Sequence, residues 1–191
     1  MKLTTLPALV AFAAITICAP ALAQSKAPTT KDQKSTAHQD TKFLEEANQG
    51  NVDEIELAQL ALKKSQNDDV KNFAQKMIHD HNMLIDNLKP FADEAGKPAP
   101  SHPSVATEAE KLKLDMLSGE SFDKAYIKAM VEDHHKDLQA FRAEVKSTGY
   151  PAFRSAVEQG ELVVQEHLEM INQIAKKNGI KPAPASAASG T

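Results

Sequence analysis

Four residues that can bind a metal ion or a proton interrupt the apolar stripes of this chain: Glu54, His81, His134 and His167. Each lies in a segment whose apolar residues recur with the period of an α-helix, where Leu, Ile, Val or Phe would be usual. Imidazole and carboxylate are suitable ligands for zinc, copper, iron or manganese. If the four segments form a bundle, we expect these side chains to meet in its core as one mononuclear site.

The same positions also allow a metal-free interpretation, in which ordinary half-buried histidines form hydrogen bonds to carboxylates and water. Buried imidazoles are expected to titrate near neutral pH, so the cluster would then respond to protons. The neighbouring Asp80, Asp133 and Glu166 lie about 100° around their helices from the histidines. They would support a metal site only after a modest helix rotation.

A di-iron centre is not indicated by the spacing of these residues. Ferritin-like di-iron proteins use a Glu from each of two helices and a Glu-x-x-His pair from each of the other two. This chain has such a pair in Glu132 and His135, off the apolar stripe of its helix. His79 and His135 could add ligands or form a surface metal patch, but helical geometry favours solvated positions. Met77 and Met130 could supply thioether ligands to copper, but such residues are more often core filler.

The elements that must position the four residues are all predicted to be helical. The chain has no Trp and only 7 Gly, and residues with high helix propensity dominate it. Apolar periodicity and turn residues predict helices over residues 41–64, 68–95, 105–117, 121–146 and 152–177. Pro90 is expected to kink or end the second of these. Short turns after the first and fourth helices predict two antiparallel hairpins.

The predicted organisation is an all-α domain over residues 41–178, an antiparallel four-helix bundle with a short extra helix in its central connection. Residues 24–40 are polar and are predicted to be a flexible linker. Residues 179–191 are rich in Pro, Ala and Ser and are predicted to be a flexible tail.

Residues 1–23 have the pattern of a secretory signal peptide. Lys2 precedes an apolar run, and Ala21-Leu22-Ala23 fits a cleavage site. The only cysteine, Cys18, lies within this segment, so the mature chain would have no thiolate ligand or disulfide. No later apolar stretch is long enough for a transmembrane helix. The formal net charge of −4 gives no indication of nucleic-acid binding.

Several short motifs, in a fixed order, carry a resemblance to a known family. They are Phe43-x-x-x-Ala47, Glu54-Ile55-Glu56-Leu57-Ala58, Val70-Lys71-Asn72-Phe73-Ala74 through Asp80-His81, Phe122-Asp123-Lys124-Ala125-Tyr126-Ile127, Asp133-His134 and Glu166-His167-Leu168. Over roughly residues 41–177 the chain resembles the bacterial exported family called domain of unknown function 4142. The resemblance implies a ferritin-like four-helix bundle in the periplasm or associated with the outer membrane. His79, His135 and Pro90 depart from a generic member.

Three functions are consistent with these observations. The first is a non-enzymatic exported bundle that binds one transition-metal ion (Zn, Cu, Fe or Mn) or responds to pH through its core His and Glu. The second is a metal-free structural or interaction module of the bacterial envelope. The third, a metal-dependent oxidoreductase, is disfavoured by the incomplete di-iron pattern. The sequence specifies neither a protein partner nor an oligomeric state.

Overall fold

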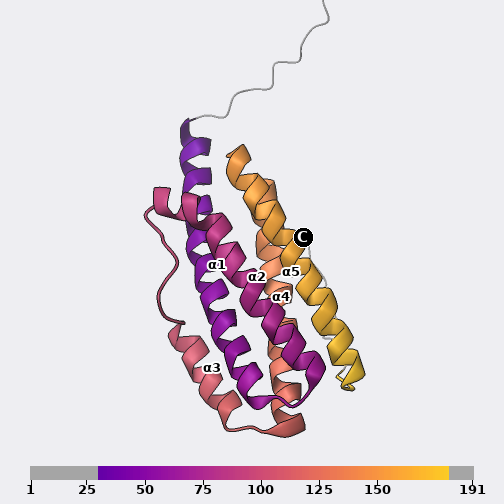
Figure 1. Ribbon diagram of the computed structural model, residues 1–191. Helices are drawn as coiled ribbons and strands as arrows, with labels where there is room; N and C mark the ends of the chain where they lie inside the picture. The colour runs from indigo at the N-terminus through magenta and orange to yellow at the C-terminus, as the bar shows by residue number, and fades with distance from the viewer. Residues whose placement is uncertain (1–29, 181–191) are drawn as a thin grey trace, which may run out of the picture.

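The computed structural model describes residues 30–180, with side chains from residue 37 onward. Within this range the chain forms helices α1 (Thr30–Lys64), α2 (Asp68–Glu94), α3 (Val105–Asp115), α4 (Gly119–Ser147) and α5 (Pro151–Lys177), and no strand. The four long helices run side by side, and the short α3 lies outside them along α1 (Figure 1). The predicted all-α antiparallel bundle with an extra helix in the central connection is therefore confirmed.

The two hairpins α1–α2 and α4–α5 form the largest helix contacts of the bundle. The hairpins join where α2 contacts α5 and α1 contacts α4, so each helix has two neighbours around a shared core. Side chains with less than 2 % exposure fill that core, among them Phe73, Phe122, Tyr126, Phe153 and Ile171. The two hairpins therefore enclose a single core to which all four long helices contribute.

Local sequence signals fix where the helices begin and end. The side chain of Asn67 accepts a hydrogen bond from the Asp69 N–H, and Ser104 accepts one from the Thr107 N–H. Such caps satisfy backbone donors that have no partner within the helix. At the other end of α2, Gly96 has a φ of 68°, a left-handed conformation that glycine adopts without the cost of a Cβ. These signals explain why the predicted bounds of α2 and the predicted start of α3 agree closely with the structure.

Helix α1 begins at Thr30, well before the predicted start at Thr41. The predicted linker over residues 24–40 therefore overlaps the helix from Thr30 onward. The prediction relied on low hydrophobicity, but residues 30–40 contain neither Pro nor Gly, so nothing in them interrupts a helix. The Thr148 hydroxyl also donates a hydrogen bond to Asp40, which ties this part of α1 to the rest of the domain.

Helix α2 continues through Pro90 to Glu94, so the proline does not end it. The next residue, Phe91, packs against Phe153 and Tyr150 with ring centroids 5.2 and 5.8 Å away. Ala92 is 1 % exposed. Packing of this last turn against α5 offsets the backbone hydrogen bond that the proline cannot donate.

The predicted signal peptide over residues 1–23 lies outside the described residues, as do residues 24–29 of the predicted linker and 181–191 of the predicted tail. Among the helices of the described part, none combines the length and apolar character that a membrane crossing requires.

Candidate metal centre

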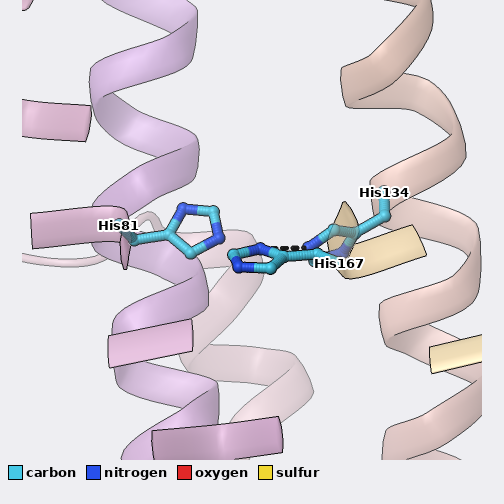
Figure 2. Close-up of side chains that lie close together, drawn as sticks. All are labelled: His81, His134 and His167. Atoms are coloured by element: carbon cyan, nitrogen blue, oxygen red, sulfur yellow. Dashed lines mark hydrogen bonds between the residues drawn. The ribbon is translucent and has the colours of Figure 1, made fainter. Parts of the chain in front are cut away.

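The structure places the side chains of Glu54, His81, His134 and His167 in the interior of the bundle, one from each long helix. Their exposed fractions are 5 %, 1 %, 0 % and 0 %. The three imidazoles point toward one another from α2, α4 and α5 (Figure 2). One ring nitrogen from each histidine lies within 4.8 Å of one ring nitrogen of each of the others. Residues far apart in the sequence thus form a compact cluster of nitrogen atoms.

The apolar stripes of the helices explain why the histidines point into the core. Buried apolar side chains occur three or four residues before and after each histidine, as in Met77 and Leu84 around His81. The ring of Phe73 lies against the cluster, with its centroid 6.0 Å from that of His134 and 6.1 Å from that of His167. The imidazoles are therefore held in a largely apolar layer.

Each histidine has one ring nitrogen that faces a hydrogen-bond acceptor outside the cluster. Nδ1 of His81 lies 2.8 Å from the side-chain oxygen of Asn51, and Nδ1 of His134 lies 2.9 Å from the carbonyl oxygen of Met130. Nε2 of His167 lies 2.8 Å from the Asp80 carboxylate. Because these partners accept hydrogen bonds, the three nitrogens carry the protons. The second nitrogen of each neutral ring then has a free lone pair.

These lone pairs are directed into the space between the rings. Nε2 of His134 lies 3.4 Å from Nδ1 of His167. Nε2 of His81 lies 3.2 Å from Oε2 of Glu54 but has no hydrogen-bond partner among the described residues. The inward nitrogens of the three histidines thus lie close together, and the Glu54 carboxyl lies beside that of His81. Either a metal ion or a proton would satisfy these lone pairs. Two ligands of a tetrahedral ion with bonds of about 2.0–2.1 Å lie roughly 3.3 Å apart, close to the His134–His167 spacing.

Burial controls the charge of this cluster. It raises the pKa of Glu54 well above its ordinary value, and the charges of Asp137 and Asp133 add to the effect. Burial lowers the pKa of His134 to about 3, and it lowers the pKa of His81 well below its ordinary range. The expectation that the buried imidazoles titrate near neutral pH is therefore wrong for these two rings. They are neutral at physiological pH, which is the form that binds metal.

The Asp80 carboxylate supports His167 through a chain of polar contacts. It also forms an ion pair with Lys76 at 2.8 Å, and Lys76 lies 3.2 Å from Glu166. Burial alone would raise the pKa of Asp80, but the hydrogen bonds from Lys76 and His167 outweigh it and hold that pKa below its ordinary value. A charged acceptor therefore faces the outer nitrogen of His167, as in many metal-binding histidines.

The sequence interpretation of the supporting residues was only partly right. Asp80 contacts a histidine, but on α5 rather than on its own helix. Asp133 instead pairs with Lys136 at 3.2 Å, and Glu166 pairs with Lys76. Asn51 was missed, although it is 4 % exposed and lies one helical turn before Glu54 on the same stripe. A buried amide beside a candidate ligand was the available signal.

The remaining histidine candidates lie away from the core, and the two methionines are part of it. Glu132 and His79 are exposed, and His135 is partly exposed, so the Glu132-x-x-His135 pair lies outside the core. Met77 and Met130 are fully buried core residues. Met130 contributes to the site through its backbone carbonyl oxygen, which holds His134.

Comparison with known proteins identifies the family. The family described as Domain of unknown function (DUF4142) matches residues 24–174, so the chain belongs to it. A search of curated proteins gives no match.

Two solved structures share the fold. A DUF305 protein from Streptomyces coelicolor, described as secreted, is 14 % identical with a TM-score of 0.65, over 76 % of this chain and 96 % of that one. A DUF305 fragment from Deinococcus radiodurans is 16 % identical with a TM-score of 0.64, over 73 % of this chain and 96 % of that one. At this level of identity the likeness extends to the helical fold alone.

Proposed function

We propose that this protein is an exported four-helix bundle that binds one transition-metal ion through His81, His134 and His167, with Glu54 as the fourth ligand. The observation that carries the proposal is the orientation of the rings. Each histidine directs one nitrogen to a hydrogen-bond acceptor and the other toward the neighbouring histidines. Histidines that bind metals usually show this division of their two nitrogens.

The donor set favours a metal of intermediate softness. Three imidazoles and one carboxylate suit Zn²⁺, Cu²⁺, Fe²⁺ or Mn²⁺, and affinity at such sites generally increases toward copper. Four ligands from the protein would complete a tetrahedral coordination shell. We therefore propose a binding role for the ion, such as storage, transport or stabilisation of the fold, rather than turnover of a substrate.

Export to the periplasm or to the outer membrane is part of the same proposal. It is supported by the pattern of residues 1–23, in which Lys2 precedes an apolar run and a small-residue cleavage site. The description of the Streptomyces coelicolor protein as secreted is consistent with it. Histidine and carboxylate ligands suit an exported protein, since neither depends on the redox state of a thiol.

Elemental analysis of the purified protein tests the proposal. We expect about one transition-metal ion per chain in the wild type, and its loss in the double variant His81→Ala, His134→Ala. A matched control, His79→Ala with His135→Ala, removes two histidines outside the cluster and should retain the ion. Metal well below one ion per chain in the wild type, together with unchanged melting on addition of Zn²⁺ or Cu²⁺, would contradict the proposal.

A metal-free envelope module is the alternative, and one observation favours it. The pKa of Glu54 is raised well above its ordinary value by burial, so a proton on this carboxyl also satisfies the cluster. In this case the wild type and the double variant would both lack metal, and the cluster would serve only to fix the packing of the four helices.

A further inference from the structure

A pocket of about 260 Å³ opens on the side of the bundle where α1, α3 and α4 meet. Its lining includes five carboxylate residues and one lysine: Asp53, Glu54, Glu110, Asp133, Asp137 and Lys136. The proposed metal ligand Glu54 therefore belongs to both the histidine cluster and this pocket. We call the pocket the acidic pocket.

Glu54 connects the pocket to the histidines through its two carboxylate oxygens. Oε2 lies 3.2 Å from Nε2 of His81, and Oε1 lies 3.2 Å from Nδ1 of His134. Among the described residues, Oε1 has no hydrogen-bond partner, although the residue is only 5 % exposed. A buried carboxylate oxygen without a donor is costly unless a cation or proton approaches it.

Other acidic side chains line the same pocket, and the charges of Asp137, Asp133 and Asp53 act on Glu54. Asp53 is already engaged, since it accepts hydrogen bonds from the backbone N–H of Ser104 and from Gln49. Asp133 pairs with Lys136, whose side chain is 69 % exposed. Together with Asp137 and Glu110, these groups leave the pocket with more carboxylates than cations. A cleft of one charge sign raises the local concentration of the opposite ion.

We propose that the acidic pocket holds a hydrated divalent cation on carboxylate oxygens and passes it, by way of Glu54, to the three histidines. The proposal rests on the metal-binding function proposed above. Oxygen ligands suit a hydrated ion, and imidazole nitrogens suit an ion that has lost its water. The chain would thus contain two successive cation sites that share one carboxylate.

Stopped-flow absorbance with Co²⁺ tests the transfer step, because Co²⁺ bound by imidazoles in a tetrahedral site absorbs visible light. The amplitude reports binding to the histidines, and the rate constant reports the approach through the pocket. In the double variant Asp133→Asn, Asp137→Asn we expect association about tenfold slower at low salt, with a smaller difference at high salt. The matched control Asp86→Asn, Glu158→Gln removes two exposed carboxylates on α2 and α5 and should keep the wild-type rate.

Two further variants distinguish passage of the cation through the acidic pocket from a general effect of protein charge on the association rate. Lys136→Gln removes the positive charge of the pocket and should accelerate association about twofold. Gly50 lines the pocket, and a Cβ at this position would meet no atom within 4 Å. Gly50→Leu should therefore fit on α1 and obstruct the pocket, which slows association and dissociation alike and leaves the affinity unchanged.

Binding of Mn²⁺ tests the oxygen site independently of the histidines. In the variant His81→Ala, His134→Ala we expect Mn²⁺ to broaden the NMR signals of residues that line the acidic pocket, and in Asp133→Asn, Asp137→Asn we expect little broadening. The proposed role of the acidic pocket would be overturned if every pocket variant bound Co²⁺ at the rate of the control and Mn²⁺ caused no local broadening. The histidine site would remain supported by the cobalt absorbance band. If Mn²⁺ broadened the signals of the pocket but the wild type showed no cobalt band, the histidine site would be refuted. The proposed transfer of the cation from the pocket to the histidines would then be refuted as well.

Discussion

Two of the buried polar clusters in the described part of the bundle differ in which groups face each other. In the histidine cluster, the proton-bearing nitrogens point outward and the lone pairs point inward. In the second cluster, near Asp40 on α1, the Glu144 carboxyl is 2 % exposed and Thr148 is 1 % exposed. The Thr148 hydroxyl donates to Asp40 Oδ2 at 2.9 Å, while Oδ1 of Asp40 and Oε1 of Glu144 have no partner among the described residues. We call Asp40 and Glu144 the acid pair.

The difference indicates which cation each cluster is suited to. The acid pair consists of two carboxyls that one shared proton can satisfy, and burial together with Asp40 raises the pKa of Glu144 to about 7. The histidine cluster brings together three imidazoles from three helices with the Glu54 carboxyl beside them, and for this donor set we propose a metal ion. Burial of polar groups therefore does not by itself favour a metal ion over a proton, and the metal proposal depends on the direction of their hydrogen bonds.

The largest expected difference between the clusters is in their response to metal. At a Zn²⁺ concentration 1,000 times the Kd, binding should stabilise the wild type by about 4 kcal/mol, or raise Tm by roughly 8–16 °C. The variant His81→Ala, His134→Ala should show little of this shift, whereas Glu144→Gln should show all of it. Differential scanning calorimetry measures the effect. An equal shift in all three proteins would show that Zn²⁺ acts elsewhere on the chain.

A second prediction concerns the close approach of α4 and α5, which holds His134 beside His167. A Cβ added at Gly160 would lie 2.3 Å from Cε1 of Phe141, so a side chain here must displace a buried ring. Overpacking of this kind typically costs about 1–3 kcal/mol. We expect Gly160→Ala to lower the free energy of unfolding by about that amount and to weaken metal binding, measured by urea denaturation and by titration with Co²⁺.

The exposed helical position Gln159 provides the control for this packing argument. Gln159→Ala changes the neighbouring residue of α5 without adding a group between the helices, so its stability should remain within about 0.5 kcal/mol of the wild type. If Gly160→Ala were as stable as Gln159→Ala, the helix separation would not be what fixes the histidine spacing.

A third prediction concerns the acceptors that orient the rings. Asp80→Asn keeps the size of the side chain but removes the charge that faces Nε2 of His167. Loss of such a partner typically weakens metal affinity by about 10–100-fold. Competition with a chelator measures the change. Glu166→Gln, which also loses a contact to Lys76 but does not touch His167, should alter the affinity by less than about threefold. If Asp80→Asn and Glu166→Gln bound the metal with equal affinity, the hydrogen bond that orients His167 would not contribute to metal binding.

Much of the fold could be predicted from the sequence because its signals are local and repeated. The apolar periodicity and the capping residues Asn67 and Ser104 determine where the helices lie. The inward positions of Glu54, His81, His134 and His167 follow from the same periodicity. The early start of α1 was missed because its first turns carry few apolar residues. Helix propensity and the contact of Asp40 with Thr148 act there instead.

The supporting groups of the candidate site were harder to predict because they depend on contacts between helices. Asp80 on α2 bonds a ring on α5, and Asn51 on α1 bonds a ring on α2. Neither contact has a signature at fixed sequence spacing, since both depend on which helices become neighbours and on their axial register. The acid pair has the same origin, because Asp40 and Glu144 lie on α1 and α4.

The smallest expected effect tests the acid pair through pH. The pKa of Glu144 rises from an ordinary 4.5 to about 7 in the folded chain, so the folded state binds this proton more tightly than the unfolded state. The free energy of unfolding contributed by Glu144 is therefore fully present below about pH 4.5 and is lost as the pH rises to about 7. Glu144→Gln removes this loss, and at pH 8 we expect its Tm to exceed that of the wild type by a few degrees, as about 1 kcal/mol would produce.

The comparison of melting curves from pH 4 to pH 8 isolates this contribution, because other buried carboxyls titrate in both proteins. Asp40→Asn should shift the loss toward lower pH, since the charge of Asp40 is one of the causes of the raised pKa of Glu144. If the Tm of the wild type and that of Glu144→Gln changed in parallel from pH 4 to pH 8, the hypothesis of a proton shared by Asp40 and Glu144 would be contradicted. We also expect Zn²⁺ to raise the Tm of the wild type and of Glu144→Gln by the same amount. The two results together would support a proton at the acid pair and a metal ion at the histidine cluster.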